Sequence, residues 1–137
     1  MARRKLTAEG TLVLECEGLS QLLNDSEPVV ALVAEGRRRG MDVVISALTI
    51  IEAAHRRTHP ARLAWLLSGL RVEPVGDEQA RAAAAVLAGT GLHGHTYAID
   101  AAVAEMALRQ QKPVVLLTSD ADDMTKLCGG QVRIVAV

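Results

Sequence analysis

A chain of 137 residues has the length of one domain; half of its residues are hydrophobic and 23% are charged. At this length folding buries roughly 68% of the unfolded chain's surface, enough for one core without disulfides. The net charge of −1 argues against a protein that attracts nucleic acid through a strong overall positive field. Trp65 and Tyr97 are the only aromatic residues, which excludes a surface that stacks successive bases on several aromatic platforms.

The cysteines, the apolar stretches and the start of the chain indicate the compartment in which the protein works. No uncharged stretch reaches membrane-spanning length, and the basic start at 1–5 precedes an apolar run too short for a signal peptide. Cys16 and Cys128 are too few for a disulfide framework or a structural zinc site. We therefore expect one domain over 1–137 that works in a reducing cytoplasm, with residues 1–10 as a flexible N-terminal segment.

The first half of the chain begins with an apolar strand at 11–14, followed by a helix that ends at the turn 24–26. Pro28 opens the next helix, which runs to 39 and stops at Gly40, and a strand follows at 42–45. Ser46, or alternatively Thr49, caps a helix from 47 to about 57. A further helix begins at Pro60 and ends at 70.

The second half continues with a strand at 71–75 and an alanine-rich helix that Asp77 caps and that runs to 87. A loop at 89–94 leads to a helix at 97–109, which Pro113 separates from a strand at 114–117. A short helix at 121–127 and a strand at 132–137 complete the chain. Five short apolar strands interleaved with helices predict an α/β domain, with a parallel sheet covered by helices on both faces.

Ligands of such sheets bind at the carboxyl ends of the strands, and acids stand at those points. Glu15 follows the first strand and Asp120 the fourth, while Glu52 and Asp100 interrupt apolar helical stretches. Each has a structural interpretation as well. Glu52 could lie on a solvated helix face, and Asp100 could favour a helix N-terminus through the macrodipole. Asp120 could be a helix N-cap, with Asp123 in a position similar to that of a capping box.

Four converging carboxylates would raise one another's pKa values unless cations occupied the space between them. Oxygen ligands of this kind select hard divalent cations, so we expect Mg²⁺ or Mn²⁺, as one ion or two. Two such ions a few ångströms apart can activate a water molecule and stabilise the leaving oxygen of a phosphodiester. The residues alone therefore predict a metal site, and they do not specify its substrate.

Four motifs, in their order and spacing, resemble a PIN-domain ribonuclease of the kind found as the toxin of bacterial VapBC-type toxin–antitoxin pairs. They are LVLECEGLS at 12–20, SALTIIEA at 46–53, AIDAAVA at 98–104 and VLLTSDADD at 115–123. The resemblance spans 12–135 and implies a three-layer PIN-like domain. It further implies cleavage of single-stranded RNA with Mg²⁺ or Mn²⁺, a homodimer, and inhibition by a cognate antitoxin protein.

Carried over by motif, the family's catalytic and metal-binding acids fall on Glu15, Glu52, Asp100 and Asp120. The hydroxyl positions near the metal fall on Thr118 and Ser119, and Asp123 matches a supporting acid.

The first acid of the family pattern is Asp, whereas this chain has Glu15, whose carboxylate is about 1.5 Å further from the backbone. Three interpretations stay open. Glu15 reaches the metal through a folded rotamer, or Glu17 contributes beside it, or the protein is a catalytically weakened PIN-fold module that binds RNA or a partner. A phosphotransfer site at Glu15–Glu17 is disfavoured, because it needs an Asp nucleophile and a suitably placed downstream Lys.

Basic residues near the acids are the predicted RNA contacts. Arg56 and Arg57 follow Glu52 by about one turn and are expected to meet backbone phosphate, as is His95. His93 and His95 do not predict a zinc site, because no third ligand has suitable spacing. Trp65 shares an apolar helix with several leucines, which predicts a place in the core or at a dimer face.

Overall fold

The computed structural model describes residues 9–54 and 59–137, and its centre is a parallel five-stranded sheet. The strands are β1 (Thr11–Leu14), β2 (Asp42–Ser46), β3 (Arg71–Glu73), β4 (Val114–Thr118) and β5 (Arg133–Ala136). Their order is β3-β2-β1-β4-β5, so β1 is the middle strand and pairs with both β2 and β4. The predicted α/β class and parallel sheet are confirmed.

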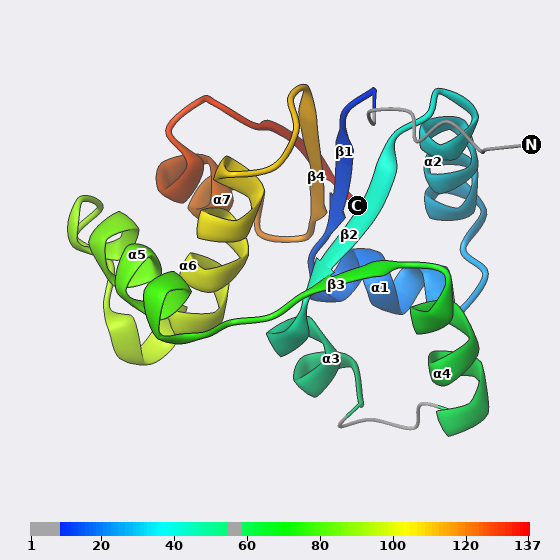
Figure 1. Ribbon diagram of the computed structural model, residues 1–137, viewed down its shortest axis with the longest axis horizontal. Coiled ribbons are helices and arrows are strands. Elements are labelled where there is room, and N and C mark those ends of the chain that lie inside the picture. Colours follow the sequence, from blue (N-terminus) through cyan, green and yellow to red (C-terminus); the bar gives the residue numbers. More distant parts are fainter. Residues whose placement is uncertain (1–8, 55–58) are drawn as a thin grey trace, which may run out of the picture.

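Helices cover both faces of the sheet (Figure 1). They are α1 (Cys16–Leu23), α2 (Glu27–Arg38), α3 (Ala47–Ala54), α4 (Pro60–Ser68), α5 (Asp77–Ala88), α6 (Gly94–Leu108) and α7 (Ala121–Cys128). Because strand side chains alternate between faces, Leu12 and Leu14 pack against α1–α4, while Val13 packs against α5–α7. The domain therefore has the three layers that the motif resemblance implied.

The carboxyl ends of the strands meet at one edge of the molecule, the lower edge in Figure 1. At the centre of this edge Leu14 of β1 is in register with Leu117 of β4. The residues that follow, Glu15 and Thr118, are consequently neighbours at the end of the sheet, and alternation turns both toward the α5–α7 layer.

Several element boundaries differ from the sequence predictions. The strand at 71–75 ends at Glu73, because Pro74 has no N–H to continue the ladder. The cap of α5 is Gly76 and not Asp77: the Gly76 N–H donates to Gln79 Oε1 at 2.9 Å. Ser46 caps α3 as predicted, its Oγ accepting from the Leu48 N–H at 3.2 Å. The predicted end of this helix near 57 lies outside the described residues.

The loop predicted at 89–94 ends earlier, because α6 begins at Gly94 and is kinked at Tyr97 (φ −110°, ψ 16°). Regular helix therefore starts just after Tyr97, close to the predicted start. Of the segment 1–10, residues 1–8 lie outside the described residues, and the Glu9 N–H donates to Gly40 O at 3.1 Å.

Of the two places predicted for Trp65, the core is wrong, and a dimer face stays a prediction. Its side chain is 69% exposed, and the Arg62 guanidinium lies 5.9 Å from the centroid of its ring. Leu63 and Leu66 of the same helix are buried, so α4 presents its leucines to the core and its tryptophan to solvent. No helix in the described ranges is long and apolar enough to cross a membrane.

Candidate metal centre

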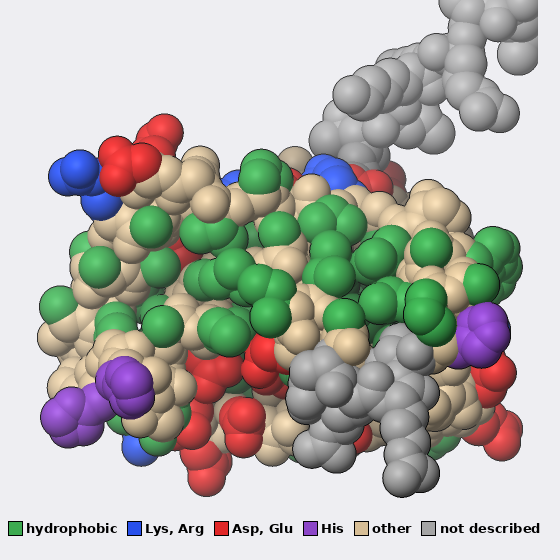
Figure 2. All heavy atoms as spheres, turned by 90° about the horizontal axis from the view of Figure 1, so that it is seen from below, with side chains coloured by type: hydrophobic (Ala, Val, Ile, Leu, Met, Phe, Trp, Pro, Cys, Tyr) green, Lys and Arg blue, Asp and Glu red, His purple; other side chains and the backbone are tan. Residues whose placement is uncertain are grey.

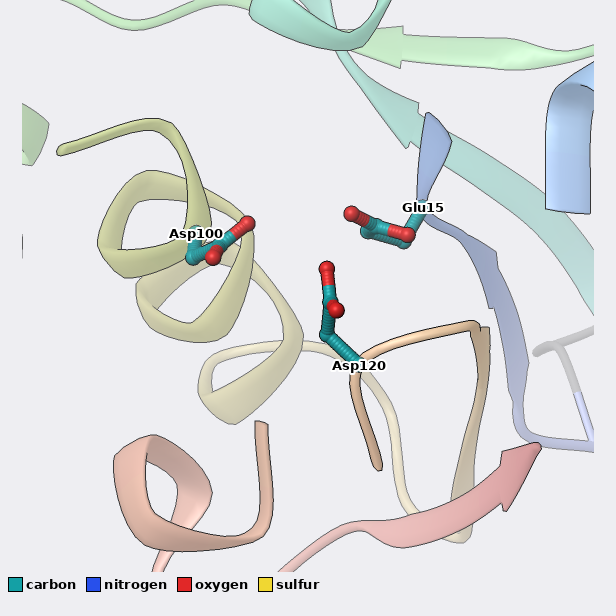
Figure 3. Close-up of side chains that lie close together, drawn as sticks. All are labelled: Glu15, Asp100 and Asp120. Atoms are coloured by element: carbon teal, nitrogen blue, oxygen red, sulfur yellow. The ribbon is translucent and has the colours of Figure 1, made fainter. Parts of the chain in front are cut away.

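Three acidic side chains from different elements point toward one another at the carboxyl edge of the sheet (Figure 3). Glu15, Asp100 and Asp120 each offer a carboxylate oxygen, and these three oxygens all lie within 4.8 Å of one another. Figure 2 looks at this edge directly and shows Asp and Glu side chains gathered on it. Residues 85 and 20 positions apart in sequence are thus brought within reach of one ion.

Glu15 owes its position to the central strand pair. It is the N-cap residue of α1 with an extended backbone (φ −84°, ψ 178°), and its N–H donates to Leu117 O at 3.0 Å. This bond continues the β1–β4 ladder by one residue and fixes the Glu15 backbone to the end of β4. The side chain is only 3% exposed, so its carboxylate lies inside the protein and not in solvent.

Thr118 connects two of the acids. Its hydroxyl donates to Glu15 Oε2 at 3.2 Å and accepts from the Asp120 N–H at 2.9 Å. The residue is fully buried at the last position of β4. Thr118 therefore lies beside the cluster, at the hydroxyl position that the motif predicted.

Asp100 belongs to α6, in the α5–α7 layer toward which the Glu15 side chain points. It lies three residues after the kink at Tyr97, in the first turn of the regular part of α6, and its side chain is half-buried. The residues that follow it, 101–107, are all buried, because α6 packs between the sheet and the helices α5 and α7. The helix that anchors the α5–α7 layer thus carries Asp100 to the end of β1.

Asp120 stands at the N-cap position of α7, as its structural interpretation expected. Within the described chain its side chain makes no capping hydrogen bond, and its backbone (φ −110°, ψ 55°) directs the carboxylate toward Glu15 and Asp100 (Figure 3). An N-cap aspartate ordinarily accepts from the first turn of its helix. The carboxylate of Asp120 is instead part of the cluster.

The electrostatics of the cluster favour a cation. Burial, followed by the charges of Asp100 and Glu52, raises the pKa of Glu15 from 4.5 to about 7. Burial, followed by Asp120, Glu52 and Asp123, raises the pKa of Asp100 from 3.8 to about 6. Across the described ranges no Lys or Arg forms an ion pair with Glu15, Asp100 or Asp120. Clustered carboxylates without a basic partner fit a hard divalent cation.

Glu52 borders this group from the α1–α4 layer. Its carboxylate is not among the three oxygens within 4.8 Å, yet its charge raises the pKa values of Glu15 and Asp100. It also contributes, after burial, to raising the pKa of the Cys16 thiol to about 11. The four acids predicted from the sequence are therefore grouped as three together and one adjacent.

The other predicted residues are less closely associated with the cluster. The Glu17 carboxylate accepts from Gln21 Nε2 at 3.2 Å, and it is the Glu17 backbone that lowers the pKa of Glu15. Asp123 is half-buried in the first turn of α7. Ser119 is exposed, without a side-chain hydrogen bond to the described residues, and His95 is exposed in the first turn of α6. Arg56 and Arg57 lie outside the described residues.

Gly18 lies near the start of α1, and no motif in the sequence marks it as part of the site. A Cβ at this position of α1 would lie 3.2 Å from Leu117 O and 3.3 Å from Leu117 Cβ, so the glycine lets α1 approach the end of β4 closely. Its signal in the sequence is a glycine within the first turn after a strand-end acid, where the helix must pass the neighbouring strand.

Comparisons with known proteins identify the fold. No protein family and no curated protein matches the chain by sequence. The structure of VapBC2 from Rickettsia felis bound to a promoter DNA fragment contains a chain that aligns with a TM-score of 0.68 and 13% identity. This alignment covers 93% of the present chain and 98% of that chain.

Two further structures align over most of both chains. One is FitAB bound to the IR36 DNA fragment, with a TM-score of 0.62, 19% identity, and 92% and 94% of the two chains covered. The other is FitAcB from Neisseria gonorrhoeae, with a TM-score of 0.57, 20% identity, and 90% and 96% covered. At these identities the likeness is one of fold. The resemblance to the PIN-domain toxins of VapBC-type pairs is thereby confirmed at the level of the fold.

Proposed function

We propose that the protein is a metal-dependent endoribonuclease that cleaves phosphodiester bonds of single-stranded RNA and acts as the toxin of a toxin–antitoxin pair. The observation that carries the proposal is the convergence of Glu15, Asp100 and Asp120 within 4.8 Å at the carboxyl edge of the sheet. The motif resemblance supplies the substrate class. The fold shared with chains of the VapBC2 and FitAB structures supports the toxin role.

In this proposal Glu15, Asp100 and Asp120 hold Mg²⁺ or Mn²⁺, as one ion or two, and Glu52 adds negative charge from α3. When bound, the metal supplies positive charge that polarises a phosphoryl oxygen and makes a water molecule more acidic. Thr118 orients Glu15, while Ser119, Asp123 and Glu17 support the site. Arg56, Arg57 and His95 contact the RNA backbone.

The proposal extends to assembly and location. VapBC2 and FitAB are two-component complexes, and by analogy the present chain is inhibited by a separate antitoxin protein. We further propose a homodimer that works in the cytoplasm, where Cys16 and Cys128 stay reduced. Both thiols have raised pKa values, mainly through burial, which suits unreactive cysteines.

The proposal is tested by D100N, which keeps the shape of the side chain and removes its charge. We expect Mn²⁺-dependent cleavage of single-stranded RNA to fall by more than about 100-fold, because one of three metal ligands loses its affinity for the ion. D122N is the matched control, since Asp122 is exposed on α7 outside the cluster. EDTA should stop cleavage by the wild type and added Mn²⁺ should restore it. Unchanged cleavage by D100N would refute the assignment.

The longer acid at position 15 favours one alternative, a catalytically weakened PIN-fold module that binds RNA or a partner. The same experiment separates the two functions. A wild-type protein that binds Mn²⁺ and single-stranded RNA in calorimetry, and leaves the RNA intact, is such a module. A protein that binds neither Mn²⁺ nor single-stranded RNA is neither the proposed nuclease nor an RNA-binding module of this kind.

A further inference from the structure

The side chains of Glu15 and Thr118 form a buried pair across the two central strands. Leu14 and Leu117 are in register, and the Glu15 N–H donates to Leu117 O at 3.0 Å. Exposure is 3% for Glu15 and 0% for Thr118. The backbone of Glu15 therefore has a fixed position relative to the Thr118 hydroxyl, and the length of the side chain decides where the carboxylate lies.

The direction of the hydroxyl proton follows from its two partners. Thr118 Oγ1 accepts from the Asp120 N–H at 2.9 Å, which uses a lone pair. A hydroxyl has one proton, and here it is donated to Glu15 Oε2 at 3.2 Å. One oxygen of Glu15 is thus held by Thr118 while the same carboxylate lies within 4.8 Å of Asp100 and Asp120.

We propose that Thr118 is a positioning residue matched to the length of Glu15, so that this chain requires glutamate, and not aspartate, at position 15. An aspartate carboxylate would end about 1.5 Å closer to the backbone. Because the ladder bond to Leu117 holds that backbone, the shorter side chain loses either the Thr118 hydroxyl or the approach to the other acids. The inference rests on the proposed metal site. Within that site, the length of the Glu15 side chain fits the position of the Thr118 hydroxyl and does not weaken the site.

Mn²⁺ binding, measured by isothermal titration calorimetry without RNA, is the first test. We expect E15D and T118V each to weaken Mn²⁺ affinity by about 10–100-fold, as losses of orienting partners of metal ligands do. T118S keeps the hydroxyl and should stay within about threefold of the wild type. T125V is the matched control, because the Thr125 hydroxyl is exposed and, among the described residues, bonds only within α7, to Ala121 O at 2.6 Å. Tighter Mn²⁺ binding by E15D, or unchanged binding by T118V, would overturn the proposal.

A second test needs no metal. In urea unfolding with EDTA, T118V should reduce the folding equilibrium constant at least about threefold more in the Glu15 protein than in E15A, because only the former has a carboxylate that pairs with Thr118. The lost bond to the Asp120 N–H is common to both backgrounds and cancels. Additive effects would overturn the pairing. Absence of Mn²⁺ binding by the wild type, with a non-additive cycle, would remove the proposed nuclease function and leave the Glu15–Thr118 pair standing.

Discussion

The carboxyl group of Glu15 keeps its proton to a higher pH than an ordinary glutamate, since burial and neighbouring charge raise its pKa from 4.5 to about 7. Between these two values the metal-free folded protein binds more protons than the unfolded chain, so the free energy of unfolding falls as the pH rises. At about 1.4 kcal/mol per pKa unit, Glu15 accounts for a loss on the order of 3 kcal/mol. Asp100, with its pKa raised to about 6, acts in the same direction.

We therefore expect the Tm of the protein in EDTA to fall between pH 5 and pH 8, and E15Q to flatten that fall. Mn²⁺ should raise the Tm most at pH 8, where the carboxylates are ionised and bind the cation. E35Q is the matched control: nearby Arg38 lowers the pKa of Glu35, so this exposed acid is ionised in both states across the range. A Tm in EDTA that climbs steadily from pH 5 to pH 8 would contradict this electrostatic account.

At the same residue scale, the four acids could be predicted from the sequence, but their separate roles could not. Asp120 fits an N-cap as well as a ligand by pattern, and only the structure shows that its side chain makes no capping hydrogen bond to the described residues and lies in the acidic cluster. Thr118 was expected near the metal, whereas its bond to Glu15 spans 103 positions and depends on β1 and β4 being neighbours. Nothing local in the sequence specifies that adjacency.

Among the elements, α1 bears most directly on the site, because its N-cap is Glu15 and its first turn passes β4 at Gly18. Replacing a helical glycine by alanine ordinarily stabilises by about 0.5–1 kcal/mol. At Gly18 the added Cβ would meet Leu117 O at 3.2 Å, and a backbone atom of a central strand cannot move aside. We expect G18A to lower the free energy of unfolding by about 1 kcal/mol or more and to weaken Mn²⁺ binding, measured by urea unfolding and calorimetry.

G36A is the control for this prediction. A Cβ at Gly36 of α2 would meet Leu12 Cδ2 at 3.3 Å, the far end of a flexible side chain that can shift. This variant should be neutral or slightly stabilising and should bind Mn²⁺ as the wild type does. Equal stability of G18A and G36A would mean that α1 does not depend on its close approach to β4.

Apolar runs and breaker residues predict every strand and helix of the described chain. They do not predict the exact ends, because neighbouring residues compete to cap a helix and these patterns do not show which one does so. Asp77 is the better capping residue by type, yet the chain caps α5 at Gly76, where Gln79 reaches back to the free N–H. Likewise α6 gains a turn before Tyr97 that the glycine-rich composition of 89–94 concealed. In both cases a local hydrogen bond or kink moved the boundary by one or a few residues.

For the molecule as a whole, the acids lie where the two helical layers meet at the sheet edge. Asp100 belongs to the α5–α7 layer and Glu52 to the α1–α4 layer, while Glu15 and Asp120 follow the central strands between them. Without a cation these like charges oppose the contact between α3 and α6. A bound metal should turn this repulsion into attraction of both layers to one cation, so that the carboxyl edge becomes more rigid than the rest of the molecule.

Hydrogen–deuterium exchange tests this inter-layer role. At short exchange times, where local openings dominate, we expect Mn²⁺ to slow amide exchange about tenfold in α3 and around Tyr97 of α6. Exchange in α2 should change little, because α2 packs on β1, β2 and α1 and carries none of the four acids at the sheet edge. D100N should lose the effect, because it removes the charge through which α6 is proposed to hold the ion. Equal slowing of α2, α3 and α6 would instead indicate that metal stabilises the whole domain without joining its layers at this edge.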